Sequence, residues 1–212
     1  MTAAEASGVF LAFEGGDGAG KSTQADLLAD WLTGHGHTVV RTHEPGGSPI
    51  GAQVRRLLLS TAEHPMSPRA EALLYAAERA EHVASVVAPA MSRGDVVVCD
   101  RYLDSSVAYQ GVGRGLGADT VEQISRWATG GLVPTLTVLL DLDPQQALSR
   151  SEDQADRLES EPLVCHRRVR RAFVDLAARE PHRDVILDAA RPASEVHADV
   201  VEAVARVVGR RS

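Results

Sequence analysis

The sequence predicts an α/β fold in which helices cover both faces of a five-stranded parallel sheet. Three observations predict it. Short apolar runs alternate five times with segments of helical periodicity, a pattern that favours parallel strands joined by right-handed crossovers. The chain has 212 residues and shows no internal repeat or linker, so we expect one domain over 1–212. Aromatic residues make up only 4% of the chain, so the core must be aliphatic.

The first half of the chain is expected to supply three strands. Each is a short apolar run that ends at turn-forming residues. These strands are 9–14, 38–43 and 95–100. Residues 1–8 read as a flexible tail. A helix begins at Lys21, since Ala25, Leu28, Ala29 and Leu32 form an apolar stripe at helical spacing. Two more helical patterns cover 50–60 and 68–91.

The second half is expected to supply the remaining two strands, at 135–143 and 184–188. The helical patterns in this half are 104–110, 119–129, 168–180 and a closing helix with valines at 196, 200, 204, 207 and 208. Ligands of parallel sheets bind beyond the carboxyl ends of the strands. The residues that follow 14, 43, 100, 141 and 188 are therefore the first places to look for a site.

Composition narrows the classes of partner. The chain has 22 Lys and Arg against 29 Asp and Glu, a net charge of −7, which argues against nucleic-acid or anionic-membrane partners. The chain has only two cysteines, and it shows no signal peptide and no apolar run that approaches about 20 residues. We therefore expect a soluble protein of the cytoplasm. The eight histidines lack the spacing of metal ligands, so we expect them to be solvated.

A glycine-rich segment between the first strand and the first helix predicts a nucleoside triphosphate site. It matches G-x-x-x-x-G-K-[ST], and it has the strand before it and the helix after it that the motif requires. Its backbone N–H groups and the helix N-terminus would bind phosphate, Lys21 would reach the β- and γ-phosphates, and Ser22 would ligate Mg²⁺. The nucleotide-binding residues are Gly15, Gly16, Asp17, Gly18, Ala19, Gly20, Lys21, Ser22 and Thr23.

Four further segments identify the kind of nucleotide enzyme. They are DRYLDSSVAYQ at 100–110, EPGG at 44–47, VRRLLL at 54–59 and LLYAAERA at 73–80. With the glycine-rich loop they closely resemble the thymidylate kinase family, over about residues 9–208. The resemblance implies a P-loop kinase fold with a short lid. It also implies transfer of the γ-phosphoryl group of ATP to dTMP, giving dTDP and ADP for dTTP biosynthesis, and a homodimer formed through helices such as 68–91.

The chemistry of that reaction calls for cations rather than a general base. An acceptor phosphate with a second pKa of about 6 is already a nucleophilic dianion at pH 7. The site must hold two polyanions in line and neutralise their charge. The resemblance implies that Arg101 clamps the acceptor phosphate with help from Arg55. Asp100 would hold Mg²⁺ or orient Arg101, and Asp17 would contact the 3′-hydroxyl of the acceptor.

Base recognition is assigned by the same resemblance. Tyr75 and Arg79 are four residues apart on one helical face, where Tyr75 would stack on thymine and Arg79 would bond its O4 side. Tyr109 would pack beneath the sugar. The other residues expected at the acceptor are Glu44, Pro45, Ser105, Ser106 and Gln110.

The expected lid is residues 150–161, where Arg150 and Arg157 would neutralise charge on the transferred group. The same segment carries five acidic residues, which is unusual for a phosphate clamp. His43 also departs from the family pattern, in which arginine commonly precedes EPGG. Two rival readings are a kinase for another nucleoside monophosphate, such as dUMP or AMP, and a nucleotide-dependent switch. The switch predicts a guanine-specificity sequence such as N-K-x-D, which the chain lacks.

Overall fold

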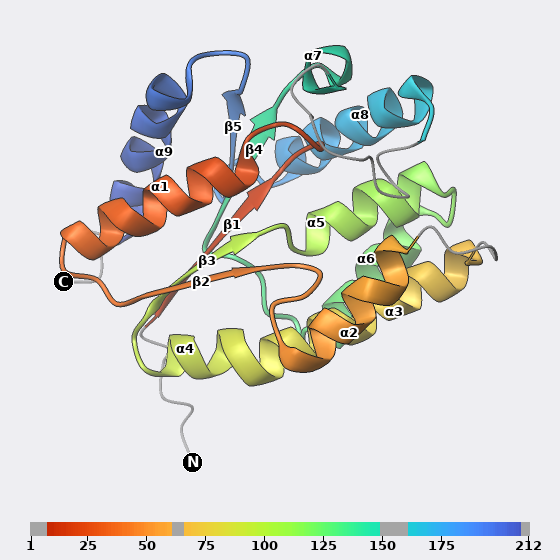
Figure 1. The fold of residues 1–212 in the computed structure, drawn as a ribbon, viewed down its shortest axis with the longest axis horizontal. Coiled ribbons are helices and arrows are strands. Elements are labelled where there is room, and N and C mark those ends of the chain that lie inside the picture. Colours follow the sequence, from red (N-terminus) through yellow and green to blue (C-terminus); the bar gives the residue numbers. More distant parts are fainter. Residues whose placement is uncertain (1–7, 61–65, 149–160, 209–212) are drawn as a thin grey trace.

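The strands of the computed structural model form one parallel sheet (Figure 1), as the sequence predicts. Residues 8–60, 66–148 and 161–208 are described. The strand order is β2-β3-β1-β4-β5. The strands are β1 (Val9–Glu14), β2 (Val39–His43), β3 (Val96–Asp100), β4 (Leu136–Asp141) and β5 (Asp184–Asp188).

Helices connect the strands and cover the sheet. They are α1 (Lys21–Gly34), α2 (Pro49–Leu59), α3 (Pro68–His82), α4 (Ala88–Ser92), α5 (Leu103–Ser106), α6 (Ala118–Ala128), α7 (Pro144–Leu148), α8 (Leu163–Arg179) and α9 (Ala193–Val208). Two π-helical segments, η1 (Val83–Val87) and η2 (Val107–Gly113), continue α3 and α5.

The sheet is buried on both faces, which explains why its strands read as continuous apolar runs. Along β1, Val9, Leu11 and Phe13 pack with α1 and α9 on one face. Phe10 and Ala12 point to the other face and pack with η1 and α4. Figure 1 shows α1 and α9 together on one side of the sheet.

Two helices begin where the sequence places a serine before a proline. Ser48 caps α2 by accepting the Gly51 N–H at 2.9 Å. Ser67 caps α3 by accepting the Ala70 N–H at 3.4 Å. Serine satisfies an otherwise unpaired N–H in the first turn, and proline has no N–H to satisfy.

The helical segments differ from the expectation in three places. The expected helix 104–110 begins at Leu103 and continues through η2 to Gly113. Helix α8 begins at Leu163, five residues before the predicted start. The prediction placed the start too late because the buried residues of this helix begin only at Val169. Helix α7 was not expected, since its five residues are too few to show periodicity. The Asp143 side chain accepts the Gln145 N–H at 2.9 Å and supports this short helix.

The strand order makes β1 and β3 neighbours, so their carboxyl ends lie side by side at one end of the sheet. β1 and β3 are parallel neighbours, with Phe13 opposite Asp100, and β2 places His43 opposite Asp100 on the other side. The connections from β1 and β3 leave toward opposite sides of the sheet. A crevice beyond the carboxyl ends of such strands is the usual ligand site.

Two expected segments fall wholly or partly outside the described residues. Of the tail 1–8 only Gly8 is described, and its N–H donates to Met91 O at 3.0 Å. Of the lid 150–161 only Glu161 is described, so Arg150 and Arg157 lie outside the described residues. Within the described part of the chain, no helix is both long and apolar enough to cross a membrane.

Candidate functional site

The loop after β1 is shaped by glycines. Gly15 and Gly18 have positive φ angles of 138° and 73°. A Cβ at Gly15 would lie 2.5 Å from Leu140 O, and one at Gly18 would lie 2.7 Å from Ala147 O. The chain can therefore turn sharply at Gly15 and Gly18 only because neither residue has a side chain. This turn brings the N-terminus of α1 to the carboxyl end of the sheet.

Lys21 is the first residue of α1 and is buried beside the loop. Its Nζ donates to Gly16 O at 2.6 Å. Burial, and then the positive charge of Arg101, lower the Lys21 pKa to about 8, although the carboxylates of Asp17, Asp100 and Glu14 oppose this shift. A buried ammonium next to a guanidinium is a site where an anion is stabilised.

Arg101 is the second cation, and it follows β3. It is the one non-glycine residue of the described chain with a positive φ, 68°, and its N–H donates to Phe13 O at 2.8 Å. Its guanidinium donates to Gly15 O at 3.0 Å, to Ser105 Oγ at 3.1 Å and to Asp17. Arg101 thus joins the ends of β1 and β3.

Asp17 accepts from Arg101 through one carboxylate oxygen and from the Tyr109 hydroxyl, at 2.7 Å, through the other. Burial disfavours the charge of Asp17, but Arg101 and Lys21 outweigh it, and the Asp17 pKa falls to about 2. Asp17 is a carboxylate at neutral pH and can accept a hydroxyl group of a ligand.

Glu14 was missed by the sequence analysis. It is the last residue of β1 and is buried. Its Oε1 accepts the N–H groups of Tyr102 at 2.8 Å and Ser105 at 3.1 Å, and its Oε2 accepts the Ser105 hydroxyl at 2.6 Å. Burial raises the Glu14 pKa despite these bonds. A carboxylate at the end of an apolar strand was the signal in the sequence, because such a group needs buried partners.

Ser22 and Asp100 are the two candidate Mg²⁺ ligands, and the structure brings them together. The Ser22 hydroxyl donates to Asp100 Oδ2 at 2.5 Å, beside Lys21. One carboxylate and one hydroxyl fit Mg²⁺, which keeps waters and shares phosphate oxygens rather than needing a full protein cage. The described residues contain no group of three or more His, Cys, Asp or Glu suited to a metal.

Arg79 lies deep in the same crevice and is only 1% exposed. Its Nε donates to Glu44 Oε2 at 2.7 Å. Its Nη2 donates to Tyr102 O and to Ser106 Oγ, each at 3.0 Å, and its Nη1 donates to Ser125 Oγ at 3.3 Å. The guanidinium therefore connects α3 to the loops after β2 and β3.

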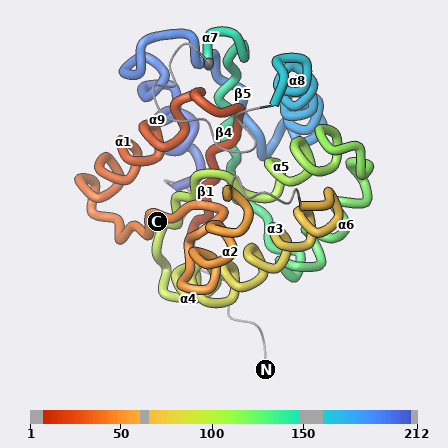
Figure 2. The backbone as a smooth tube through the Cα atoms, turned by 45° about the vertical axis from the view of Figure 1, so that its right-hand side comes forward, coloured from red at the N-terminus to blue at the C-terminus, as the bar shows by residue number. Residues whose placement is uncertain are grey.

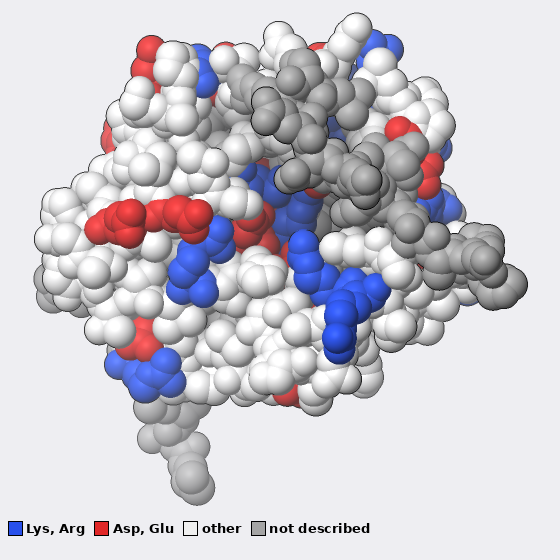
Figure 3. Space-filling model, in the orientation of Figure 1, with Lys and Arg blue, Asp and Glu red and all other residues white. Residues whose placement is uncertain are grey.

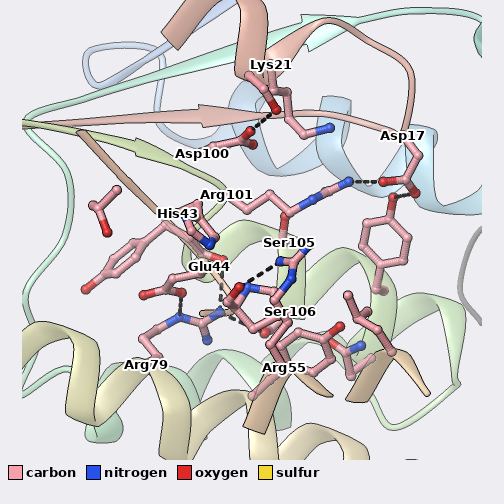
Figure 4. Close-up of a pocket in the computed structure, with 18 of the residues that line it drawn as sticks. Asp17, Lys21, His43, Glu44, Arg55, Arg79, Asp100, Arg101, Ser105 and Ser106 are labelled. Atoms are coloured by element: carbon pink, nitrogen blue, oxygen red, sulfur yellow. Dashed lines mark hydrogen bonds and ion pairs between the residues drawn. The ribbon is translucent and has the colours of Figure 1, made fainter. Parts of the chain in front are cut away.

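These groups surround one cavity of about 570 Å³, a volume typical of small-molecule sites. Figure 4 shows Lys21 and Asp17 near its top, Glu44 and Arg79 lower, and Arg101 between them. Figure 3 shows charged side chains of both signs gathered in a hollow of this face. The expected site residues that line the cavity are Asp17, Gly18, Lys21, Ser22, Glu44, Pro45, Arg55, Tyr75, Arg79, Asp100, Arg101, Ser105, Ser106, Tyr109 and Gln110.

A second cavity of about 720 Å³ lies on the other side of the glycine-rich loop. It is lined by the loop and first turn of α1, which include Ala19, Gly20 and Thr23, and by 189–193 and Val196. Gln24 Nε2 donates to Ala193 O at 2.8 Å and joins the two walls. The sequence pointed to the end of β5 but carried no motif at 189–193. Gly18, Lys21 and Ser22 line both cavities.

The expectation that all histidines are solvated is wrong. His82 is fully buried, with its ring nitrogens 2.8 Å from Glu44 Oε1 and 2.7 Å from Thr42 Oγ1. His43 is exposed, as expected, and also lines the 570 Å³ cavity, where desolvation and then the charge of Arg55 lower the His43 pKa. Periodicity could not show this, because the partners of His82 are about 40 residues away in the chain.

Comparison with known proteins agrees with this geometry. A model of the thymidylate kinase family matches residues 13–200. The thymidylate kinase of Clavibacter michiganensis subsp. michiganensis is 55% identical over 197 residues, covering 92% of this chain and 93% of that protein. The thymidylate kinase of Deinococcus radiodurans is 51% identical over 199 residues, covering 93% and 96%. The crystal structure of thymidylate kinase from Ehrlichia chaffeensis has a TM-score of 0.74 at 31% identity, covering 93% and 98%.

The fold and the two cavities that share Lys21 define a phosphotransferase of the P-loop kinase class. The family model and relatives above 50% identity over nine-tenths of the chain then give the family. The chain belongs to the thymidylate kinase family, whose reaction is the ATP-dependent phosphorylation of dTMP, generally with Mg²⁺. The resemblance seen in the sequence is confirmed.

The Lys21 pKa can be measured directly, because Lys21 is the only lysine in the sequence. Protein grown with ¹³Cε-lysine should give one lysine signal that titrates at a pH of about 8. Addition of ATP and Mg²⁺ should move the titration toward the ordinary lysine value of about 10.4, since phosphate oxygens favour the charged form. A midpoint that stays near 8 with ATP present would mean that Lys21 does not meet the phosphates.

Glu78 supplies a stability prediction. It is fully buried, its Oε1 accepts the Gly46 N–H at 2.8 Å, and its Oε2 has no hydrogen-bond partner among the described residues. Burial and then the charge of Glu44 raise the Glu78 pKa from 4.5 to about 7. Because the folded protein holds this proton more tightly than the unfolded chain, stability from Glu78 is present below pH 4.5 and is lost as pH rises through 7.

Urea unfolding of wild type and Glu78→Gln at pH 4.5 and pH 8 measures this effect. Relative to the variant, wild type should lose up to about 3 kcal/mol between the two pH values. Glu195→Gln, which alters an exposed carboxylate of α9, is the control and should show no such trend. An equal difference at both pH values would show that Glu78 keeps an ordinary pKa.

Proposed function

We propose that the two cavities hold the two nucleotides of the reaction, dTMP in the 570 Å³ cavity and ATP in the 720 Å³ cavity. One observation carries this proposal: Gly18, Lys21 and Ser22 line both cavities. The reacting phosphates then meet at the start of α1, and transfer needs little movement of either nucleotide.

On the donor side, the N–H groups of 15–22 and the Lys21 ammonium bind the phosphates of ATP. Ser22 and Asp100 would hold Mg²⁺, which when bound supplies positive charge for the triphosphate. The lowered Lys21 pKa supports this role, because a phosphate anion replaces the hydration that burial removes.

On the acceptor side, Arg101 binds the dTMP phosphate, with Arg55 at the rim. The Arg55 guanidinium is fixed by a bond to Pro45 O at 2.7 Å. Asp17 and Tyr109 lie next to Arg101 and position the sugar, where Asp17 accepts the 3′-hydroxyl. The reaction then needs no base to remove a proton, because the nucleophile is a phosphate dianion.

The lower wall of the acceptor cavity recognises the base. Tyr75 supplies a ring face for stacking, and Arg79 donates toward the O4 side of thymine. Arg79 has five N–H donors, and four of them bind other groups of the described residues, on Glu44, Ser125, Tyr102 and Ser106. The other residues proposed for this wall are Glu44, Pro45, Ser105, Ser106 and Gln110.

Arg150 and Arg157 of the segment 150–161 are proposed to neutralise charge during transfer. Support comes from α7, which leads into this segment. The backbone of α7 lies against the glycine-rich loop, since Ala147 O would be 2.7 Å from a Cβ at Gly18. The end of α7 therefore lies beside the loop that is proposed to bind the phosphates.

We also propose that the chain is a single domain that works in the cytoplasm. The described helices all pack on one sheet or on its covering helices. Cys99 and Cys165 are free thiols, which accords with a reducing compartment.

A homodimer is proposed through α2, α3 and α6. Figures 1 and 2 show these helices on one side of the molecule. They carry exposed apolar side chains: Ile50 is 53% exposed, Leu57 59%, Leu73 57% and Trp127 84%. Large apolar groups gathered on one surface favour burial against another chain.

Arg101→Ala tests the acceptor assignment. Two or more charge-assisted hydrogen bonds to the dTMP phosphate are lost, so kcat/KM for dTMP should fall by about 10²-fold or more. The KM for ATP should change by less than about threefold, since Arg101 does not line the donor cavity. Arg56→Ala, an exposed arginine of α2 outside the cavity lining, is the control and should resemble wild type. If the KM for ATP rises as much as the KM for dTMP, the division into two cavities is refuted.

Light scattering after size exclusion tests the dimer. Wild type should have twice the 22.6 kDa mass of one chain. Leu73→Asp should give the monomer mass, because a carboxylate would be desolvated in the interface. Val164→Asp places the same charge at a 68% exposed position of α8 and should remain dimeric. A wild-type mass of one chain, or a dimer in Leu73→Asp, would contradict this interface.

A further inference from the structure

Below the acceptor cavity, four side chains form a continuous buried hydrogen-bond chain from β2 to the loop after β3. Thr42 Oγ1 is 2.7 Å from His82 Nε2, and His82 Nδ1 is 2.8 Å from Glu44 Oε1. Glu44 Oε2 accepts from Arg79 Nε at 2.7 Å. Each of the four is buried, and all of them except His82 line the 570 Å³ cavity.

Every polar atom in the middle of this chain has a partner. Glu44 accepts from Arg79 through Oε2, and His82 donates to its other oxygen, Oε1, through Nδ1–H. The second ring nitrogen of His82, Nε2, pairs with the Thr42 hydroxyl. The charge of Glu44 is balanced by Arg79. Both ring nitrogens of His82 are therefore held by hydrogen bonds.

The space around His82 is equally restricted. A Cβ at Gly47 would lie 2.5 Å from Thr42 Oγ1 and 2.6 Å from His82 Nε2. The loop after β2 thus lies directly on this contact. Glu78, one turn before His82 on α3, holds the same loop through the Gly46 N–H. The His82 ring is therefore enclosed on the side of this loop.

We propose that His82 is a positioning residue for base selection: it fixes Glu44, and Glu44 fixes the plane of the Arg79 guanidinium in the acceptor cavity. Figure 4 shows Glu44 and Arg79 facing each other. Without His82 the carboxylate loses the partner of one oxygen and can rotate, and the guanidinium rotates with it. This inference rests on the proposed role of Arg79. A donor aimed at O4 of thymine accepts thymine and rejects cytosine, which has an amino group there.

His82→Leu tests the inference, since leucine fills much of the volume and removes both hydrogen bonds. The ratio of kcat/KM for dTMP to that for dCMP should fall about 10-fold, because a buried carboxylate oxygen is left unpaired and Glu44 is no longer fixed. The KM for dTMP should rise and the KM for ATP should stay within about twofold. His82→Asn keeps a donor near the position of Nδ1 and should retain most of the discrimination.

A structural control separates positioning from loss of stability. Val87→Ala opens a buried site in η1, in the same helical run. It should lower the melting temperature without changing the dTMP to dCMP ratio. If His82→Leu also lowers the melting temperature without changing the dTMP to dCMP ratio, the inference is wrong. If His82→Leu does not fold, His82→Gln and His82→Asn decide. Glutamine keeps a polar group near the position of Nε2 but has no donor at the position of Nδ1, so His82→Gln should lower the ratio about as much as His82→Leu. An unchanged ratio in His82→Gln, or an equal loss of the ratio in both variants, overturns the inference.

Arg79→Lys distinguishes failure of this inference from failure of the acceptor assignment. If Arg79→Lys leaves the ratio and the KM for dTMP unchanged, the proposed role of Arg79 itself fails. If Arg79→Lys lowers the ratio and His82→Leu does not, only the role of His82 fails. If both act, the double variant should show less than the product of the two losses, since His82 acts through Arg79.

Discussion

The structure depends on holding two cations next to each other at the carboxyl end of the sheet, the buried Lys21 and the partly buried Arg101. Their mutual repulsion contributes to the lowered Lys21 pKa. The nearby carboxylates of Asp17, Asp100 and Glu14 oppose that shift but do not cancel it. A bound phosphate would supply the missing negative charge. This local arrangement explains how a chain with a net charge of −7 serves polyanionic substrates.

Buried carboxylates set the direction of Arg101 and Arg79, two of the arginines that line the 570 Å³ cavity. Glu14 binds the turn that carries Arg101, and Glu44 binds Arg79 directly. A carboxylate out of water needs several donors, so each one gathers N–H and O–H groups from separate segments and fixes their geometry. These contacts hold both guanidinium groups in place in advance, and fixed charges of this kind are a general means of stabilising a transition state.

Much of this architecture could be predicted from the chain. The strands β1 to β5 appeared as short apolar runs, because a sheet covered on both faces needs apolar residues at successive positions. The glycine-rich loop was evident because its function requires Gly15, Gly18 and Lys21 at fixed spacing between a strand and a helix. The family segments then grouped the expected acceptor residues, which line one cavity in the described structure.

By itself the sequence determined the five strands, the glycine-rich loop and the family, because these depend on local apolar runs and contiguous motifs. Tertiary structure alone decided the pairings that orient the site. Glu14 meets Ser105 across 91 positions, Glu44 meets Arg79 across 35, and Thr42 meets His82 across 40. It also decided that 189–193 lines the second cavity. Such contacts depend on which strands become neighbours. The sequence around a buried polar residue shows neither how deeply that residue is buried nor which residue it contacts.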